Sequence, residues 1–153
     1  MIQILNSRQK HEIAKSLREQ FGVDKLPGKV MKLGEEKLFL FTGDATDEEI
    51  KTIEEMVPVE RLGVYFAKLI HDDVKLSIEG TQILKDQIKK NVLEVDDEQA
   101  RKWMEGQELN IKTGHRNFLV IKYKDNFLGC GKASEEKVGN FVPKMRRLKI
   151  RDY

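Results

Sequence analysis

The chain has 153 residues, of which 39% are hydrophobic and 35% charged, and its formal net charge is +2. This composition is that of a globular protein and excludes disordered and collagen-like chains, and the length allows one ordinary domain or two small ones. No apolar run approaches the roughly 18 residues of a membrane span, the first residues lack a signal-peptide pattern, and the single cysteine excludes a disulfide within the chain. We therefore expect a soluble, cytoplasmic protein.

The first 72 residues are predicted to form a small α+β unit. Apolar residues recur at helical spacing behind capping residues, and short apolar runs are separated by turn residues. In chain order the predicted elements are a helix over 8–20 capped by Ser7, a hairpin over 29–33 and 37–41, a helix opened by Thr46 and Glu49 and ended by Pro58, and a strand over 62–70. The second helix is expected to bury Ile50, Ile53, Met56 and Val57.

A polar break at residues 71–73 is predicted to separate this unit from a second one. The elements predicted after it are a strand over 74–78, a helix over 81–88, a strand over 91–95, a helix opened by Asp96 and Gln99 and ended by Gly106, an extended stretch over 108–111, strands over 118–123 and 127–133, a turn at Gly139–Asn140 and a basic segment from 141 onward. Many short strands with glycine turns are typical of a small barrel.

Positive charge is concentrated at the end of the sequence. Residues 110–153 carry 11 Lys or Arg against 4 Asp or Glu, a net charge of +7, whereas residues 1–109 carry a net charge of −5. Such asymmetry indicates an anionic partner, either a nucleic acid or a membrane surface, although a solvated lysine-rich surface would show it too. The near-neutral total therefore conceals a basic region.

The sequence contains no complete motif for catalysis or metal binding. The three histidines, His11, His71 and His115, lack the spacing of metal ligands. Cys130 between two glycines fits a small strand residue better than a reactive thiol, and residues 129–132 lack the glycine spacing and the Ser or Thr of a phosphate-binding loop. We expect no catalytic residues, no cofactor and no metal.

Three stretches of the second half resemble a PUA domain, the RNA-binding barrel named after pseudouridine synthases and archaeosine transglycosylases. They are WMEGQELNI (103–111), FLVIKYKDNFLGCGKA (118–133) and VGNFVPKMRRLKI (138–150). The last two are most similar to the PUA tails of Nop/Sun-type cytosine-C5 RNA methyltransferases. The whole chain resembles ribosome-biogenesis factors that join a small pre-PUA domain to a PUA domain, and LGVYFAKLIHDDVKLSI (62–78) fits the joint between them.

The resemblance implies a fold and an activity. It implies an α+β pre-PUA domain over 1–72 and a small, mostly-β PUA pseudo-barrel over 73–153. The sequence departs from the pattern of many PUA domains, because residues 79–91 lack a Pro-Gly loop. The methyltransferase body of the Nop/Sun proteins is absent from this sequence, so the resemblance implies a binding module without the enzyme.

The candidate RNA-binding residues are basic residues and glycines that the barrel's last strands would bring together. Lysine and arginine neutralise phosphates, and glycines allow a phosphate backbone to approach closely, or else only shape a tight barrel turn. In an extended tail, alternate residues face opposite ways, so Lys144 and Arg146 would form one set and Arg147, Lys149 and Arg151 another. The full set is Lys112, Arg116, Gly129, Gly131, Lys132, Lys144, Arg146, Arg147, Lys149 and Arg151.

Aromatic residues are weaker candidates for base stacking. Trp103, Phe118 and Phe127 are expected in the core, and Phe141 is the aromatic whose placement the pattern leaves most open; Tyr123 and Tyr153 also remain candidates. A basic surface without an evident stacking platform favours structured RNA that is read by its shape.

These observations lead to three functional hypotheses. The first is a non-catalytic protein that binds ribosomal or transfer RNA during maturation or modification, with the N-terminal unit contacting an RNA-modifying enzyme or a ribosome-assembly factor. The second is a protein-interaction module that docks an RNA-modifying enzyme or a translation factor. The third is a small enzyme that uses Cys130, which we expect to be excluded by substitution of that residue.

Overall fold

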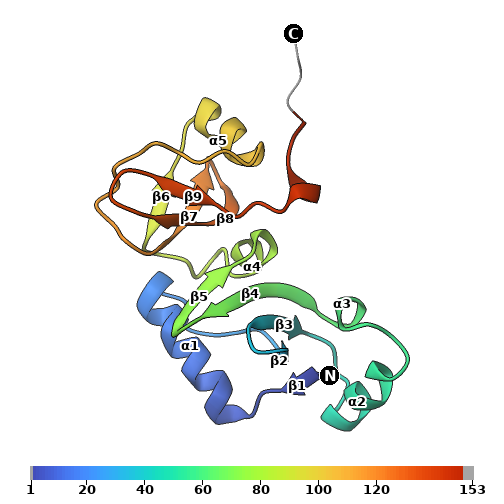
Figure 1. The fold of residues 1–153 in the computed structure, drawn as a ribbon. Helices are drawn as coiled ribbons and strands as arrows, with labels where there is room; N and C mark the ends of the chain where they lie inside the picture. Colours follow the sequence, from blue (N-terminus) through green and yellow to red (C-terminus); the bar gives the residue numbers. More distant parts are fainter. Residues whose placement is uncertain (1, 150–153) are drawn as a thin grey trace.

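Two β-sheets form the framework of the computed structural model, which describes residues 2–149. The first sheet is antiparallel and has the order β1-β2-β3-β4-β5, and the second has the order β6-β7-β8-β9. Figure 1 shows the sheets as two layers with helix α4 (Ile78–Ile83) between them. The protein is thus a mixed α/β structure, with strands and helices in both halves.

The first sheet contains the predicted hairpin. Its strands are β1 (Ile2–Ile4), β2 (Lys29–Leu33), β3 (Lys37–Phe41), β4 (Val64–Ile70) and β5 (Asp73–Leu76). Strands β2 and β3 pair from Lys29 with Phe41 to Leu33 with Lys37, as the two predicted runs require. Gly34 sits in the turn with a φ of 67°, a conformation that favours glycine.

Helix α1 (Ser7–Phe21) covers one face of this sheet and begins differently from the prediction. The cap is Asn6, not Ser7, because the Asn6 side chain accepts the Gln9 N–H at 2.9 Å and the Gln9 side chain accepts the Asn6 N–H at 3.0 Å. Ser7 is the first helical residue. The predicted stripe is correct, since Leu17 and Phe21 are fully buried.

Helix α2 (Asp47–Glu54) covers part of the opposite face and is shorter than predicted. Thr46 and Glu49 form the predicted capping box, and Ile50 is buried. Met56, however, is 72% exposed, so its expected burial is wrong. Pro58 caps a further short helix, α3 (Val59–Leu62), which delays the start of β4 to Val64.

The predicted boundary between residues 72 and 73 falls at a turn inside the first sheet. Strand β5 pairs with β4 from Ile70 with Asp73 to Ala67 with Leu76, so the assignment of this strand to the second unit is corrected. Ser77 then caps α4 by accepting the Gly80 N–H at 3.0 Å, which starts that helix three residues before the predicted position. The chain passes between the sheets after Leu76.

The second sheet holds most of the elements predicted for the barrel. Its strands are β6 (Val92–Glu94), β7 (Phe118–Tyr123), β8 (Asn126–Ala133) and β9 (Val138–Asn140), with β6 parallel to β7. Helix α5 (Asp97–Met104) has the predicted cap of Asp96 and Gln99. The predicted turn at Gly139–Asn140 is wrong, because both residues pair with β8.

The two sheets share the largest of the three hydrophobic clusters among the described residues. This cluster joins residues of α1 and the first sheet, such as Phe21 and Phe66, to Phe118 and Phe127 of the second sheet. At the joint, the backbone of α4 lies directly against β4, so a Cβ on Gly80 would overlap the Phe66 carbonyl. The Ser77 N–H donates to that carbonyl at 2.9 Å. The surfaces of the two halves are therefore held in a fixed relation.

Candidate nucleic-acid interface

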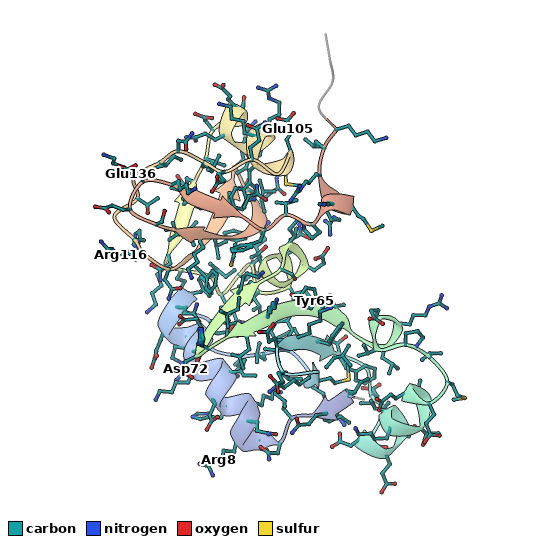
Figure 2. The ribbon with its side chains drawn as sticks, viewed as in Figure 1. Arg8, Tyr65, Asp72, Glu105, Arg116 and Glu136 are labelled. Carbon is teal, nitrogen blue, oxygen red and sulfur yellow. The ribbon has the colours of Figure 1, made fainter. Side chains whose placement is uncertain are left out.

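The predicted basic residues lie in three places rather than one. Lys112 and Arg116 are exposed on the loop between α5 and β7. Figure 2 shows Arg116 at the edge of the molecule above the end of α1, away from the 3₁₀ turn η1 (Lys144–Arg146) near the C-terminus in Figure 1. The expected convergence of this loop with the C-terminal segment is therefore wrong, because the second sheet lies between them.

The two candidate glycines are buried and serve packing. A Cβ on Gly129, whose φ is 85°, would press against Ile78 of α4, and a Cβ on Gly131 would overlap Val138 and Trp103. The Gly129 N–H also donates to the buried Thr81 hydroxyl at 3.3 Å. A phosphate therefore cannot approach these glycines, so that expectation is wrong. The alternative, that the glycines shape the barrel, agrees with their packing.

Residues 144–149 form an exposed basic segment, which we call the C-terminal segment. Lys144, Arg146, Arg147 and Lys149 are all exposed. The η1 turn rotates successive side chains by about a third of a turn, so Lys144 and Arg146 do not point the same way as expected for an extended tail, whereas Arg147 follows the turn in an extended conformation. Arg151 lies outside the described residues.

Hydrogen bonds fix the path of the C-terminal segment. The Arg147 Nε donates to the Val142 carbonyl at 2.9 Å, and the Leu148 N–H donates to the Met104 carbonyl at the end of α5 at 2.7 Å. Arg146 forms an ion pair with Glu79 of α4. Anchoring at these points lowers the entropy lost when the segment meets a ligand.

Lys132 belongs to a different group, an aromatic–lysine cluster of Lys75, Phe118, Lys132 and Phe141. The Lys132 Nζ lies 5.7 Å from the Phe118 ring centre, and the Lys75 Nζ lies 4.1 Å from the Phe141 ring centre. The two rings are 6.2 Å apart. Each ammonium is within the range of a cation–π interaction, and Phe141 remains 41% exposed.

Lys75 was not among the predicted RNA-binding residues, although the pattern of residues in β5 indicates which way its side chain points. Val74 and Leu76 are buried while Lys75 between them points to the other face, the alternation of a strand with one covered face. Burial and the neighbouring Lys68 ammonium lower the pKa of Lys75, whereas Cys130 and Glu36 act in the opposite direction. A charge count along the sequence misses Lys75 because residues 1–109 are acidic in total.

A pocket of about 130 Å³ separates the aromatic–lysine cluster from the C-terminal segment. Tyr65, Lys75 and Phe141 line it together with Glu79 and Pro143. Glu79 is the residue that pairs with Arg146, and Pro143 immediately precedes Lys144. The cluster, the pocket and the start of the C-terminal segment therefore form one continuous surface over α4.

Cys130, the one candidate nucleophile of the sequence analysis, is buried. Burial raises the pKa of the Cys130 thiol from 9.0 to about 12, outweighing a backbone hydrogen bond and the Lys75 charge, so the thiolate is scarce at neutral pH. Within residues 2–149, no three His, Cys, Asp or Glu side chains gather as metal ligands would. Trp103 and Phe127 are buried as predicted, and Tyr123 donates its hydroxyl to Asp97 at 2.5 Å; Tyr153 lies outside the described residues.

A family model identifies the second half. Residues 90–148 match the model described as the methyltransferase RsmF PUA domain. This region, which contains β6 to β9, α5 and η1, is a PUA domain that resembles the tails of Sun-type cytosine-C5 RNA methyltransferases, as the sequence motifs predicted. The matched range begins after α4, so β5 and α4 lie outside it.

No curated protein matches the chain. None of the helices in residues 2–149 is long and apolar enough to span a bilayer. A PUA domain indicates RNA binding, and the basic surfaces described above are the places where phosphates would be neutralised.

Proposed function

We propose that this chain is a non-catalytic RNA-binding protein of the cytoplasm that acts in ribosomal RNA maturation or in transfer RNA modification. The observation that carries the proposal is the exposed, anchored C-terminal segment on a PUA domain. Lys144 and Lys149 are exposed for phosphate contact, and each such contact releases counterions. Structured RNA fits because phosphate contacts read the shape of a helix rather than its sequence.

The first sheet and its helices would act as a pre-PUA unit in this proposal. Because it shares its core with the PUA domain, it would hold a fixed orientation toward bound RNA. Its helices α2 and α3 lie at the end of the first sheet that is remote from the PUA domain in Figure 1, and they offer a surface to an RNA-modifying enzyme or a ribosome-assembly factor. The acidic first turn of α2 suits a basic protein partner better than RNA.

One observation favours the alternative, a protein-interaction module. Met145 is 98% exposed and Leu148 is 52% exposed, and both belong to the C-terminal segment. Neighbouring apolar side chains that are exposed to solvent are typical of a protein-interaction site. A pull-down that keeps its protein partner after nuclease treatment, with no RNA recovered, would support this alternative.

The test measures binding to a transfer RNA transcript and to a folded ribosomal RNA fragment by fluorescence anisotropy at several salt concentrations. The double variant Lys144→Glu/Lys149→Glu is compared with Lys112→Glu/Arg116→Glu, which changes the net charge equally on the other side of the second sheet. We expect the first variant to lose at least tenfold in affinity and the salt slope to fall by about 2.

The control variant should bind within about threefold of the wild-type protein, since its residues lie away from the C-terminal segment. If the wild-type protein binds neither RNA, or if both variants bind as tightly as the wild-type protein, the proposal is wrong.

A further inference from the structure

Three lysines lie side by side on neighbouring strands of the first sheet. Lys37 of β3 pairs with Lys68 of β4, and Lys68 pairs with Lys75 of β5. The adjacent register positions, Leu38, Ala67 and Leu76, are buried against α1. Because side chains alternate along a strand, the three lysines share the face that points away from α1.

This arrangement opposes folding rather than supporting it. Like charges directly opposite each other on neighbouring strands are destabilising. Burial is the main cause that lowers the pKa of Lys75, and repulsion from the Lys68 charge lowers it further. The acidic group beside the row is Glu36, whose carboxylate lies 3.2 Å from the Lys68 Nζ and is itself 55% exposed, so it compensates only part of the charge.

The row continues onto the PUA domain. Strand β5 is the edge of the first sheet that borders the second, and Asp73 accepts a hydrogen bond from Asn117 across the gap at 3.1 Å. Lys75 at this edge lies over Phe141, and Phe141 contacts Phe118, over which Lys132 lies. Four ammonium groups from four strands therefore follow one another across the junction of the two sheets.

We propose that Lys37, Lys68, Lys75 and Lys132, which we call the lysine row, form a second phosphate-binding track that extends the RNA surface from the PUA domain onto the first sheet. The partner is the sugar–phosphate backbone of an RNA strand, with the exposed ring of Phe141 as a stacking contact for one base. This inference rests on the proposed function, because it assigns a second part of the surface that binds the same RNA.

The aromatic ring beside the row favours RNA over an acidic peptide, because a base can stack on it. Strands lie about 4.8 Å apart, so three neighbouring strands spread their lysines over about 10 Å, long enough to meet successive charges of a polyanion. A polyanion of regular spacing relieves the repulsion at each lysine in turn. The half-exposed aromatic ring beside Lys75 provides the π-face that a base stacks on.

The experiment compares two triple variants that remove the same charge. Lys37→Gln/Lys68→Gln/Lys75→Gln removes the row on the first sheet. Lys32→Gln/Lys89→Gln/Lys90→Gln removes three lysines on the α1 side, since Lys32 borders a hollow beside α1 and the Lys89 and Lys90 N–H groups meet the Phe21 carbonyl at its end. Thermal unfolding of both variants checks that they fold.

We expect the row variant to lose about tenfold in RNA affinity at 100 mM salt and the salt slope to fall by 2 to 3, while the control changes by less than threefold. Ultraviolet crosslinking of the wild-type complex should place RNA on peptides that contain Lys75 or Phe141. Equal affinities for row variant and wild type, equal losses in both variants, or crosslinks on the α1 side would overturn the inference and leave the proposed function standing.

Two other outcomes would also overturn it. If the wild-type protein binds no RNA, both the inference and the proposed function fail. If the row variant keeps its RNA affinity but loses affinity for a polyglutamate peptide that the wild-type protein binds, the row is a protein-binding surface instead.

Discussion

The C-terminal segment and the lysine row are both basic, and they arise in different ways. The C-terminal segment takes its charge from neighbouring residues of the sequence and is exposed along its length. The lysine row takes its charge from residues far apart in the sequence, each on its own strand, and Lys68 and Lys75 are partly buried. A basic stretch of sequence therefore locates only the first surface, because the second exists only through strand register.

The two surfaces also depend on different supports. The C-terminal segment is held at the end of α5 and at Val142, whereas the lysine row is fixed by the ladder of the first sheet. Helix α4 connects them, through the Arg146–Glu79 ion pair on one side and the contact of Gly80 with β4 on the other. A substitution in the support of one surface should therefore affect that surface alone, whereas a substitution in α4 should affect both.

The largest effect is expected from Trp103→Ala, which opens the core of the PUA domain one residue before the Met104 carbonyl that anchors the C-terminal segment. Trp103 is fully buried, and its Nε1–H donates to the Leu128 carbonyl at 2.9 Å. We expect a loss of about 3 to 5 kcal/mol in the free energy of unfolding, measured by urea denaturation. Trp103→Phe keeps most of the packing and should cost less, so equal losses for the two variants would contradict the packing argument.

A smaller effect is expected from Gly80→Ala, which acts on the joint between the two surfaces. The added Cβ would overlap the Phe66 carbonyl, so α4 must shift away from β4. We expect a loss of about 2 to 3 kcal/mol in the free energy of unfolding and a weaker RNA affinity. The control Gly34→Ala meets no atom within 4 Å and should cost only about 1 kcal/mol, from its left-handed backbone.

Cys130 lines the same pocket as Lys75 and gives a pH-dependent effect. Its pKa is about 12 in the folded protein, against an ordinary value of 9.0. Folding therefore favours the protonated thiol, and this contribution is complete below about pH 9 and is lost as the pH rises toward 12. The stability of the wild-type protein relative to Cys130→Ala should fall by up to about 1.4 kcal/mol per pH unit above pH 9. A difference that stays constant from pH 8 to 10.5 would contradict the burial of the thiol.

The smallest effect concerns the charges of the row itself. Burial and Lys68 lower the pKa of Lys75 below 10.5. Lys68→Gln should raise the pKa of Lys75 but leave it below that value, because burial, the larger cause, remains. Nuclear magnetic resonance titration of the lysine side chains measures this shift, and Lys32→Gln, on the opposite face, should leave Lys75 unchanged.

Local features of the structure were predictable because neighbouring residues decide them. The capping boxes at Thr46 and Asp96 form as predicted, since the side chain and the N–H that it accepts are three residues apart. Ser7 was the wrong cap because Asn6, one residue earlier, forms a capping box with Gln9, three residues after it. Short helices such as α3 escaped prediction because one turn carries too little periodicity to be recognised.

Errors concerning the sheets had a different cause. The polar residues at 71–73 read equally well as a linker or as a tight turn, and only the pairing of β5 with β4 distinguishes them. Gly139 and Asn140 resemble turn residues, yet Asn140 pairs with Gly131 and its side-chain amide donates to the Trp103 carbonyl at 2.7 Å. Pairing partners lie far apart in the sequence, so no local pattern reveals them.

By itself the sequence determined most of the helices and strands, the PUA motifs of the second half and the excess of basic residues near its end. Tertiary structure alone decided which charges are neighbours: it moved Arg116 away from the C-terminal segment, buried Gly129 and Gly131, and brought Lys68, Lys75 and Lys132 together. The physical reason is the separation along the chain over which each interaction acts. Capping and periodicity act within a few residues, whereas strand register and core packing join residues from the whole chain.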